Sequence, residues 1–289
     1  MNALVAAPAG PVLLFLAGTF LGRWLGALIQ RLAMASGYPS SHYYRLSGGR
    51  GWLGSLPVLG HFLSSRGTRS RRALALELLT GSAWLACWAF CPPAKALCGC
   101  VLLLGLIGAT CIDFDHMIIP DFFTIGLAIA GLALSAAVPA LHGSGPFLAL
   151  NCARSAAAAL LGLFVGSGLV LWLGLIGELL LNKEVLGFGD VKFVGAIGAF
   201  CGWQGAVFSL FGGALVGMAA LAVAAAHRRL SGDSAVQLFQ RESRDGGAAH
   251  FGWGAQFPFG PMLATAAALY FTLLHPWVDR YLNQYLACF

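Results

Sequence analysis

The chain has 289 residues, of which 58% are apolar and 10% are charged, whereas about 25% of the residues in an ordinary soluble domain are charged. So little charge excludes a disordered chain and a nucleic-acid-binding domain, and it is too little to cover a soluble globule of this length. The formal net charge of +6 is typical of a polytopic protein of the lipid bilayer whose cytoplasmic loops are basic.

Long apolar runs predict an all-α, polytopic integral membrane protein with about eight transmembrane helices. A run of about 20 apolar residues crosses a hydrocarbon core of roughly 30 Å as a helix, and lipid cannot satisfy an open backbone. No Lys or Arg precedes Arg23, so we expect a retained first span rather than a cleaved signal peptide. The predicted spans are 11–33, 72–91, 95–112, 121–139, 154–181, 190–202, 204–226 and 257–275. A tight turn at residues 202–204 would separate the sixth span from the seventh.

The basic residues orient these spans. The segment 34–72 contains six arginines and no acidic residue, and four more arginines follow the seventh span. Placing both segments in the cytoplasm puts both chain ends outside. We therefore expect a first span over residues 1–33, a basic cytoplasmic loop over residues 34–72, and a membrane-embedded domain over residues 73–289.

The eight cysteines lie in apolar runs or at their edges, and none forms a C-x-x-C pair. We expect them to be small packing residues. Because no cluster of His, Cys, Asp or Glu has the spacing of metal ligands, we expect no metal site. The sequence also contains neither a G-x-S-x-G elbow nor an H-E-x-x-H motif, which argues against a serine hydrolase or a zinc protease of those types.

Only eleven acidic residues occur in the chain, so the position of each is informative. Asp113 and Asp115 follow the third span, in CIDFDHMIIPD, and Asp190 follows the fifth span, in GFGD. Because two spans separate these clusters, both emerge on the same, cytoplasmic side. Carboxylates near membrane depth are costly and are therefore functional candidates. Two facing carboxyl groups can hydrolyse a peptide bond, since one activates a water as a base while the other acts as an acid.

Structural interpretations of the same acids remain open. Asp190 would serve equally as the cap of the next helix, and Asp121, directly after Pro120, is expected to be a helix N-cap. The glycines before Asp190 would allow a tight backbone path and the close approach of another chain.

Other acidic residues are expected to form ion pairs or to face water. Asp115 and Glu184 would face water or pair with Lys183 or Lys192. Arg23, inside the first span, needs a partner, and Glu77 is a candidate for it. Glu178 lies within the fifth span, where it would face a polar cavity or bond to a neighbouring helix.

The ordered set of motifs resembles the bacterial type IV prepilin peptidases, the GxGD-type aspartic proteases of the inner membrane. The set includes Asp113, Pro120-Asp121 and Gly187-Phe188-Gly189-Asp190, with Lys183-Glu184 before the last motif and Lys192 after it. Further similar segments are GRWLGALIQRL from Gly22, LPVL from Leu56, the Arg72–Glu77 entry to the second span, and PFGP from Pro258.

The resemblance implies specific roles. Asp113 and Asp190 would be the catalytic pair of a membrane-embedded aspartic peptidase domain. Gly187, Gly189, Pro120, Asp121, Glu184 and Lys192 would form the supporting motifs. The enzyme would lie in the bacterial inner membrane and cleave prepilins, or pseudopilins of type II secretion, after a glycine at the cytoplasmic face.

Proteolysis of this kind needs no cofactor, but many members also methylate the new N-terminus with S-adenosylmethionine. Many members carry two C-x-x-C pairs suited to zinc in the first cytoplasmic loop, whereas residues 34–72 contain no cysteine, so no zinc is expected. The alternative function is a polytopic transporter or proton pathway that uses intramembrane carboxylates such as Asp113 or Glu178.

Overall fold

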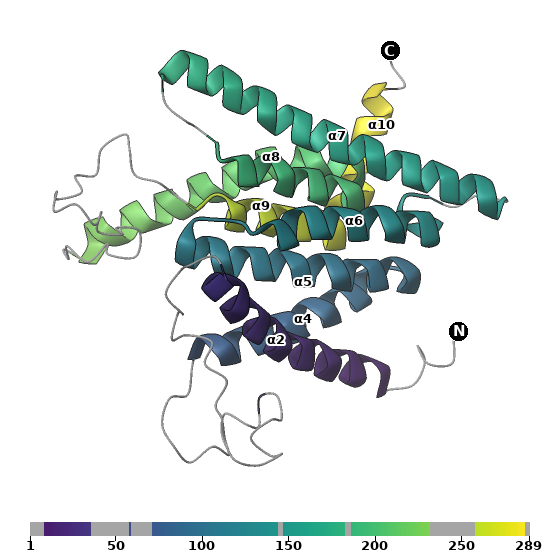
Figure 1. The fold of residues 1–289 in the computed structure, drawn as a ribbon, viewed down its shortest axis with the longest axis horizontal. Coiled ribbons are helices and arrows are strands. Elements are labelled where there is room, and N and C mark those ends of the chain that lie inside the picture. Colours follow the sequence, from purple (N-terminus) through teal and green to yellow (C-terminus); the bar gives the residue numbers. More distant parts are fainter. Residues whose placement is uncertain are drawn as a thin grey trace.

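The structure is a computed structural model that describes residues 9–35, 58, 71–143, 147–182, 186–231 and 258–286. Within these ranges the chain forms helices and turns without a strand, which confirms the all-α prediction (Figure 1). The elements are α2 (Ala9–Ala35), α4 (Arg71–Phe90), α5 (Pro93–His116), α6 (Asp121–Ala137), η3 (Pro139–Leu141), α7 (Leu148–Leu181), α8 (Phe188–Ser231), α9 (Gly260–Leu269), η4 (Tyr270–Leu274) and α10 (His275–Leu286).

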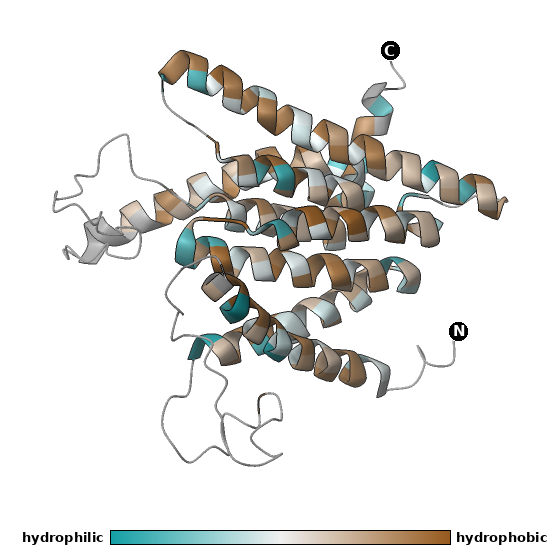
Figure 2. Ribbon diagram, viewed as in Figure 1, coloured by the Kyte–Doolittle hydropathy of each residue, from teal (hydrophilic) through white to brown (hydrophobic). Residues whose placement is uncertain are grey.

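Five of these helices are long and apolar enough to cross a membrane, and α6 is apolar but shorter. The candidate spans are Gly10–Leu32, Arg71–Phe90, Pro93–His116, Leu148–Leu181 and Phe188–Val223. Apolar residues dominate the surfaces of these helices as well as their contacts (Figure 2). The structure therefore supports a polytopic membrane protein, while the number of crossings stays a prediction.

Helix α8 consists of two antiparallel halves that meet at Gly202. This residue has φ 70° and ψ 178°, a backbone conformation that favours glycine. A methyl group built on Gly166 of α7 would lie 2.8 Å from the carbonyl oxygen of Val194 and 3.0 Å from Cβ of Ala206. Those two residues would be about 18 Å apart along a straight helix, so the chain must reverse between them. The predicted break after residue 202 is confirmed.

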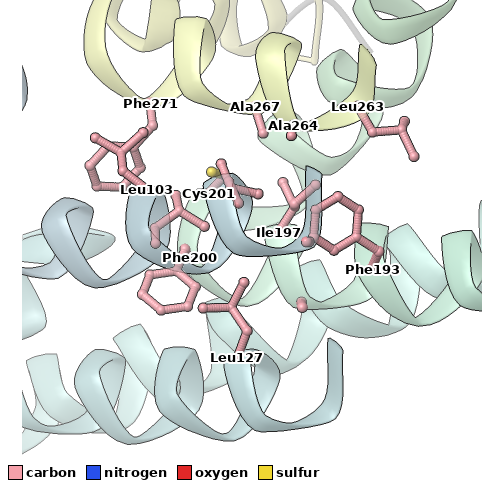
Figure 3. Packing of buried hydrophobic residues seen from close by; sticks show 14 of the residues in the cluster. Leu103, Leu127, Phe193, Ile197, Phe200, Cys201, Leu263, Ala264, Ala267 and Phe271 are labelled. Atoms are coloured by element: carbon pink, nitrogen blue, oxygen red, sulfur yellow. The ribbon is translucent and has the colours of Figure 1, made fainter. Parts of the chain in front are cut away.

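The first half of α8 lies at the centre of the bundle, between α6, α7 and α9. A methyl group on Gly162 of α7 would clash with the carbonyl of Gly198, so these two helices touch backbone to backbone, as small residues allow in membrane proteins. Large apolar side chains fill the other side, where α5, α6, α8 and α9 meet (Figure 3). They include Leu103, Leu127, Phe193, Ile197, Phe200, Leu263 and Phe271. This packing fixes the start of α8 relative to the end of α5.

Helices α2 and α4 form a second close contact, which contains the predicted ion pair. Arg23 Nη1 lies 3.4 Å from Glu77 Oε1, and Glu77 is only 1% exposed. The backbone N–H of Val58 also donates to Glu77 Oε2 over 2.6 Å. A buried carboxylate is costly unless it is paired, and these donors satisfy that need.

Three predicted boundaries are wrong. Helix α5 continues to His116, so Asp113 and Asp115 lie in its last turns rather than after it. Helix α7 begins at Leu148, six residues before the predicted start at 154. The last predicted span, 257–275, begins instead at Gly260, where Pro261 suits a first helical position. It then continues through the π-helical turn η4 into α10.

Candidate active site

Asp113 lies in the last turns of α5 and is only 5% exposed. The backbone N–H of Gly260, at the start of α9, donates to Asp113 Oδ2 over 3.0 Å. A methyl group built on Gly260 would lie 2.6 Å from that same oxygen, so the contact requires a residue without a side chain. The glycine of the PFGP segment thus holds one oxygen of Asp113 in place.

Asp190 is half-buried in the first turn of α8, where its backbone N–H bonds to the carbonyl of Gly187 over 3.0 Å. Since α8 begins at Phe188, Asp190 lies inside the helix, and the interpretation as a cap is wrong. A methyl group built on Gly260, which holds Asp113, would lie 3.1 Å from Ile119 Cδ1, and one built on Gly189, directly before Asp190, would lie 3.6 Å from Ile119 Cβ. Two acids that are 77 positions apart in the sequence therefore lie at the same end of the bundle.

The two glycines of the GFGD segment differ from Gly260 in their surroundings. Neither Gly187 nor Gly189 has a positive φ. Among the described residues, a methyl group on Gly187 would come no closer than 3.7 Å to Asp190 Oδ2, and one on Gly189 no closer than 3.6 Å to Ile119 Cβ. These are ordinary contacts, so the described chain does not show the tight backbone path that the sequence predicted.

Pro120 and Asp121 begin α6, but Asp121 is not the predicted N-cap. The capping position belongs to Pro120, and Asp121 is the first helical residue. Its Oδ1 accepts a hydrogen bond from Lys192 Nζ over 2.7 Å, and the same ammonium group lies 5.1 Å from the centre of the Phe188 ring. Lys192 therefore ties the start of α6 to the first turns of α8, beside Asp190.

Asp115, which was expected to face water or to pair with Lys183 or Lys192, has a partner that was not predicted. Asp115 Oδ1 pairs with Arg72 Nη1 over 2.8 Å, which links the end of α5 to the start of α4. Glu184, which was expected to pair with Lys183 or Lys192 or to face water, lies outside the described residues together with Lys183. Glu178 is exposed on α7 rather than turned toward a neighbouring helix, which removes one support of the transporter interpretation.

No group of three or more His, Cys, Asp or Glu side chains in the described ranges is placed to hold a metal ion. Several cysteines are buried among apolar side chains, as the packing interpretation predicts, and Cys87 Sγ donates to the carbonyl of Ala96 over 3.5 Å. The chemistry available at this end of the bundle is that of two neighbouring carboxyl groups. They can share a proton and place a water between them.

Sequence reasoning placed PFGP at the start of the last span but gave Gly260 no role. The available signal was a glycine next to a proline at the entry to an apolar helix, a place where backbone N–H groups are unpaired. Nothing in the local sequence indicates which acid would accept that N–H.

Comparisons with known proteins agree with these motifs. A model described as the type IV leader peptidase family matches residues 100–222, which include both Asp113 and Asp190. A prepilin leader peptidase/N-methyltransferase of Klebsiella pneumoniae is 32% identical over 66% of this chain and 85% of its own length. Proteins of the same description from Myxococcus xanthus and Stutzerimonas stutzeri are 28% and 29% identical, over 73% and 80% of this chain and 63% and 67% of their own lengths. No solved structure matches the chain.

Proposed function

We propose, since the chain belongs to the type IV leader peptidase family, that it is a membrane-embedded aspartic endopeptidase that removes the leader peptide of prepilins or of the pseudopilins of type II secretion. The observation that carries this proposal is that Asp113, from α5, and Asp190, from α8, lie at the same end of the bundle, where the N–H of Gly260 donates to Asp113. The names of the relatives supply the substrate class.

In the proposed mechanism, a water lies between the two carboxyl groups. The N–H of Gly260 donates to Asp113, and such a bond stabilises the ionised form of a carboxyl group. Asp113 therefore suits the role of base, which removes a proton from the water as it attacks the carbonyl carbon of the scissile bond. Asp190 supplies the proton that the leaving amine needs. No metal is required in this scheme.

The finer features of the substrate follow from the position of the pair. Both acids lie at the same end of the bundle as the arginine-bearing start of α4. The positive-inside rule assigns that end to the cytoplasm of a bacterial cell, with the protein in the inner membrane. The cleaved bond would then follow a glycine at the cytoplasmic edge of the substrate's apolar helix.

A cleavage assay in membranes tests the proposal. A prepilin is co-expressed with the wild-type chain, Asp113→Asn, Asp190→Asn or the control Asp115→Asn, and the product N-terminus is read by mass spectrometry. We expect cleavage after glycine in the wild type and the control, and a loss of about a hundredfold to ten-thousandfold in the other two. Cleavage that survives in Asp113→Asn or in Asp190→Asn would refute the mechanism.

The same spectra test methylation. The names of the relatives also include N-methyltransferase, and we propose S-adenosylmethionine as the methyl donor. One additional methyl group on the new N-terminus, dependent on added S-adenosylmethionine, would assign this activity to the chain. An unmethylated product would leave the chain a peptidase alone. Flux of a solute or of protons that depends on Asp113, without cleavage, would favour the transporter instead.

A further inference from the structure

The short turn between α5 and α6 inserts one apolar side chain, Ile119, between Gly260, which binds Asp113, and Gly189, which precedes Asp190. Ile119 is 8% exposed. A methyl group built on Gly260 would lie 3.1 Å from Ile119 Cδ1, and one built on Gly189 would lie 3.6 Å from Ile119 Cβ. Gly260 holds the carboxyl of Asp113, and Gly189 directly precedes Asp190. The two ends of one isoleucine side chain therefore contact the backbone that binds Asp113 and the backbone that carries Asp190.

The turn that holds Ile119 is fixed on both sides. Met117 adopts a left-handed conformation, φ 55°, in which its N–H bonds to the carbonyl of Asp113 over 2.8 Å. On the other side, Asp121 pairs with Lys192 of α8 over 2.7 Å. A side chain on a turn anchored at both ends cannot easily move away when neighbouring segments press against it.

We propose that Ile119 is a positioning residue that sets the separation of the carboxyl groups of Asp113 and Asp190. The inference rests on the proposed function. A branched apolar side chain suits this role because it fills the gap between Gly189 and Gly260 without a polar atom of its own. It therefore neither binds a second water nor offers a proton to either acid.

Two substitutions, which remove different amounts of the side chain, test this role. Ile119→Val removes the Cδ1 atom that faces Gly260 but keeps the β-branch that faces Gly189, whereas Ile119→Ala empties the gap. The matched control is Ile197→Ala, which removes the same atoms from a fully buried site on the same half of α8, two turns beyond Asp190. Full-length proteins are compared in membranes with a prepilin substrate, at equal amounts of folded protein.

We expect kcat to fall by about a hundredfold in Ile119→Ala, because a displacement of about 1 Å at a reacting centre has effects of this size, and by less in Ile119→Val. The KM for the substrate should change by less than about threefold, since the substitutions touch positioning rather than binding. Closing the gap brings the two acids together and strengthens their coupling, so the two inflections of the kcat pH profile should move apart.

The control separates this effect from a loss of stability. Ile197→Ala should lower the amount of folded protein without moving the inflections. If Ile119→Ala does not accumulate in membranes, Ile119→Val decides the question. The inference is overturned if the pH profile of the folded variant stays the same or narrows, or if kcat falls no further than in Ile197→Ala. Failure of the wild-type chain to cleave any prepilin would instead contradict the proposed function.

Discussion

The two ends of helix α5 use polar side chains in opposite ways. Lys95 near its start and Asp113 near its end are separated by about 27 Å along the helix axis. Lys95 lies within electrostatic range of Asp279 and 5.2 Å from the centre of the Phe271 ring. Tyr270 donates to Asp279 over 2.5 Å. We call this group, together with His142 and Ser135, the distal cluster.

Within the distal cluster, side-chain polar atoms pair with one another or with a buried backbone carbonyl. Ser135 Oγ donates to the carbonyl oxygen of Ala199 over 3.2 Å, and His142 Nε2 lies 3.2 Å from both atoms. This carbonyl needs such partners because the helix breaks at Gly202, which leaves the last carbonyls before the break without helical donors. The bonds of Ser135 and His142 thus tie α6 to α8, and the bond of Tyr270 ties the start of η4 to α10.

The polar groups are arranged differently at the other end of α5, where Asp113 and Asp190 lie; we call it the dyad end. Among the described residues, Asp113 receives one hydrogen bond, from the backbone N–H of Gly260. Buried polar groups that serve stability are normally fully paired, whereas catalytic groups need a free position for water and substrate. The difference between the two ends predicts that substitutions at the dyad end lower activity, and that substitutions at the distal end lower stability.

Among substitutions that leave the two carboxyl groups in place, a large effect is expected from Gly260→Ala. The new methyl group would lie 2.6 Å from Asp113 Oδ2, so the carboxyl group must move, and we expect turnover of a prepilin to fall by about a hundredfold. Gly126→Ala on α6 is the control, because a methyl group there meets no described atom within 4 Å. Equal turnover by the two variants, measured on folded protein, would show that this contact does not position Asp113.

A smaller effect is expected at the distal end from Tyr270→Phe. The substitution removes the hydroxyl that donates to Asp279, and loss of one partner of a buried hydrogen bond costs about 1 to 3 kcal/mol. Unfolding in detergent should therefore occur at lower denaturant concentration, while turnover per folded molecule stays at the wild-type level. A fall in turnover without a change in stability would break the distinction between the two ends.

The smallest effect is a pH dependence of stability that arises from His142. Burial lowers the pKa of this imidazole below its ordinary value, against the opposing effect of its bond to Ala199. The unfolded chain then takes up the proton at higher pH than the folded protein does. Stability is therefore retained above the ordinary pKa of about 6.5 and declines as the pH falls below it. His142→Gln should show a shallower decline of melting temperature on acidification than the wild type, and equal slopes would contradict this account.

The sequence was sufficient to predict which segments are helices, because length and apolar character decide that in a membrane. It also predicted the break at Gly202 and the pairing of Arg23 with Glu77. It did not predict which faces of the helices meet. In a soluble helix the apolar stripe marks the buried face, but lipid-facing positions here are as apolar as buried ones. The pattern therefore carries little information about how each helix is rotated about its own axis.

Long-range partners were missed for the same reason. The bond from Gly260 to Asp113 joins residues 147 positions apart, and the pairs Arg72–Asp115 and Lys192–Asp121 were not among the predicted ones. Each depends on the way the helices stack, which spacing along the chain does not determine. The catalytic roles of Asp113 and Asp190 stay predictions.

The most direct test of the central claim is a double-mutant cycle on the dyad. Prepilin turnover is measured in membranes for the wild type, Asp113→Asn, Asp190→Asn and the variant with both changes, at matched amounts of folded protein. If the two carboxyl groups act on one water as a unit, each single substitution should lose nearly as much activity as the double one. Losses that multiply in the double variant, as independent sites would give, would contradict a shared active site.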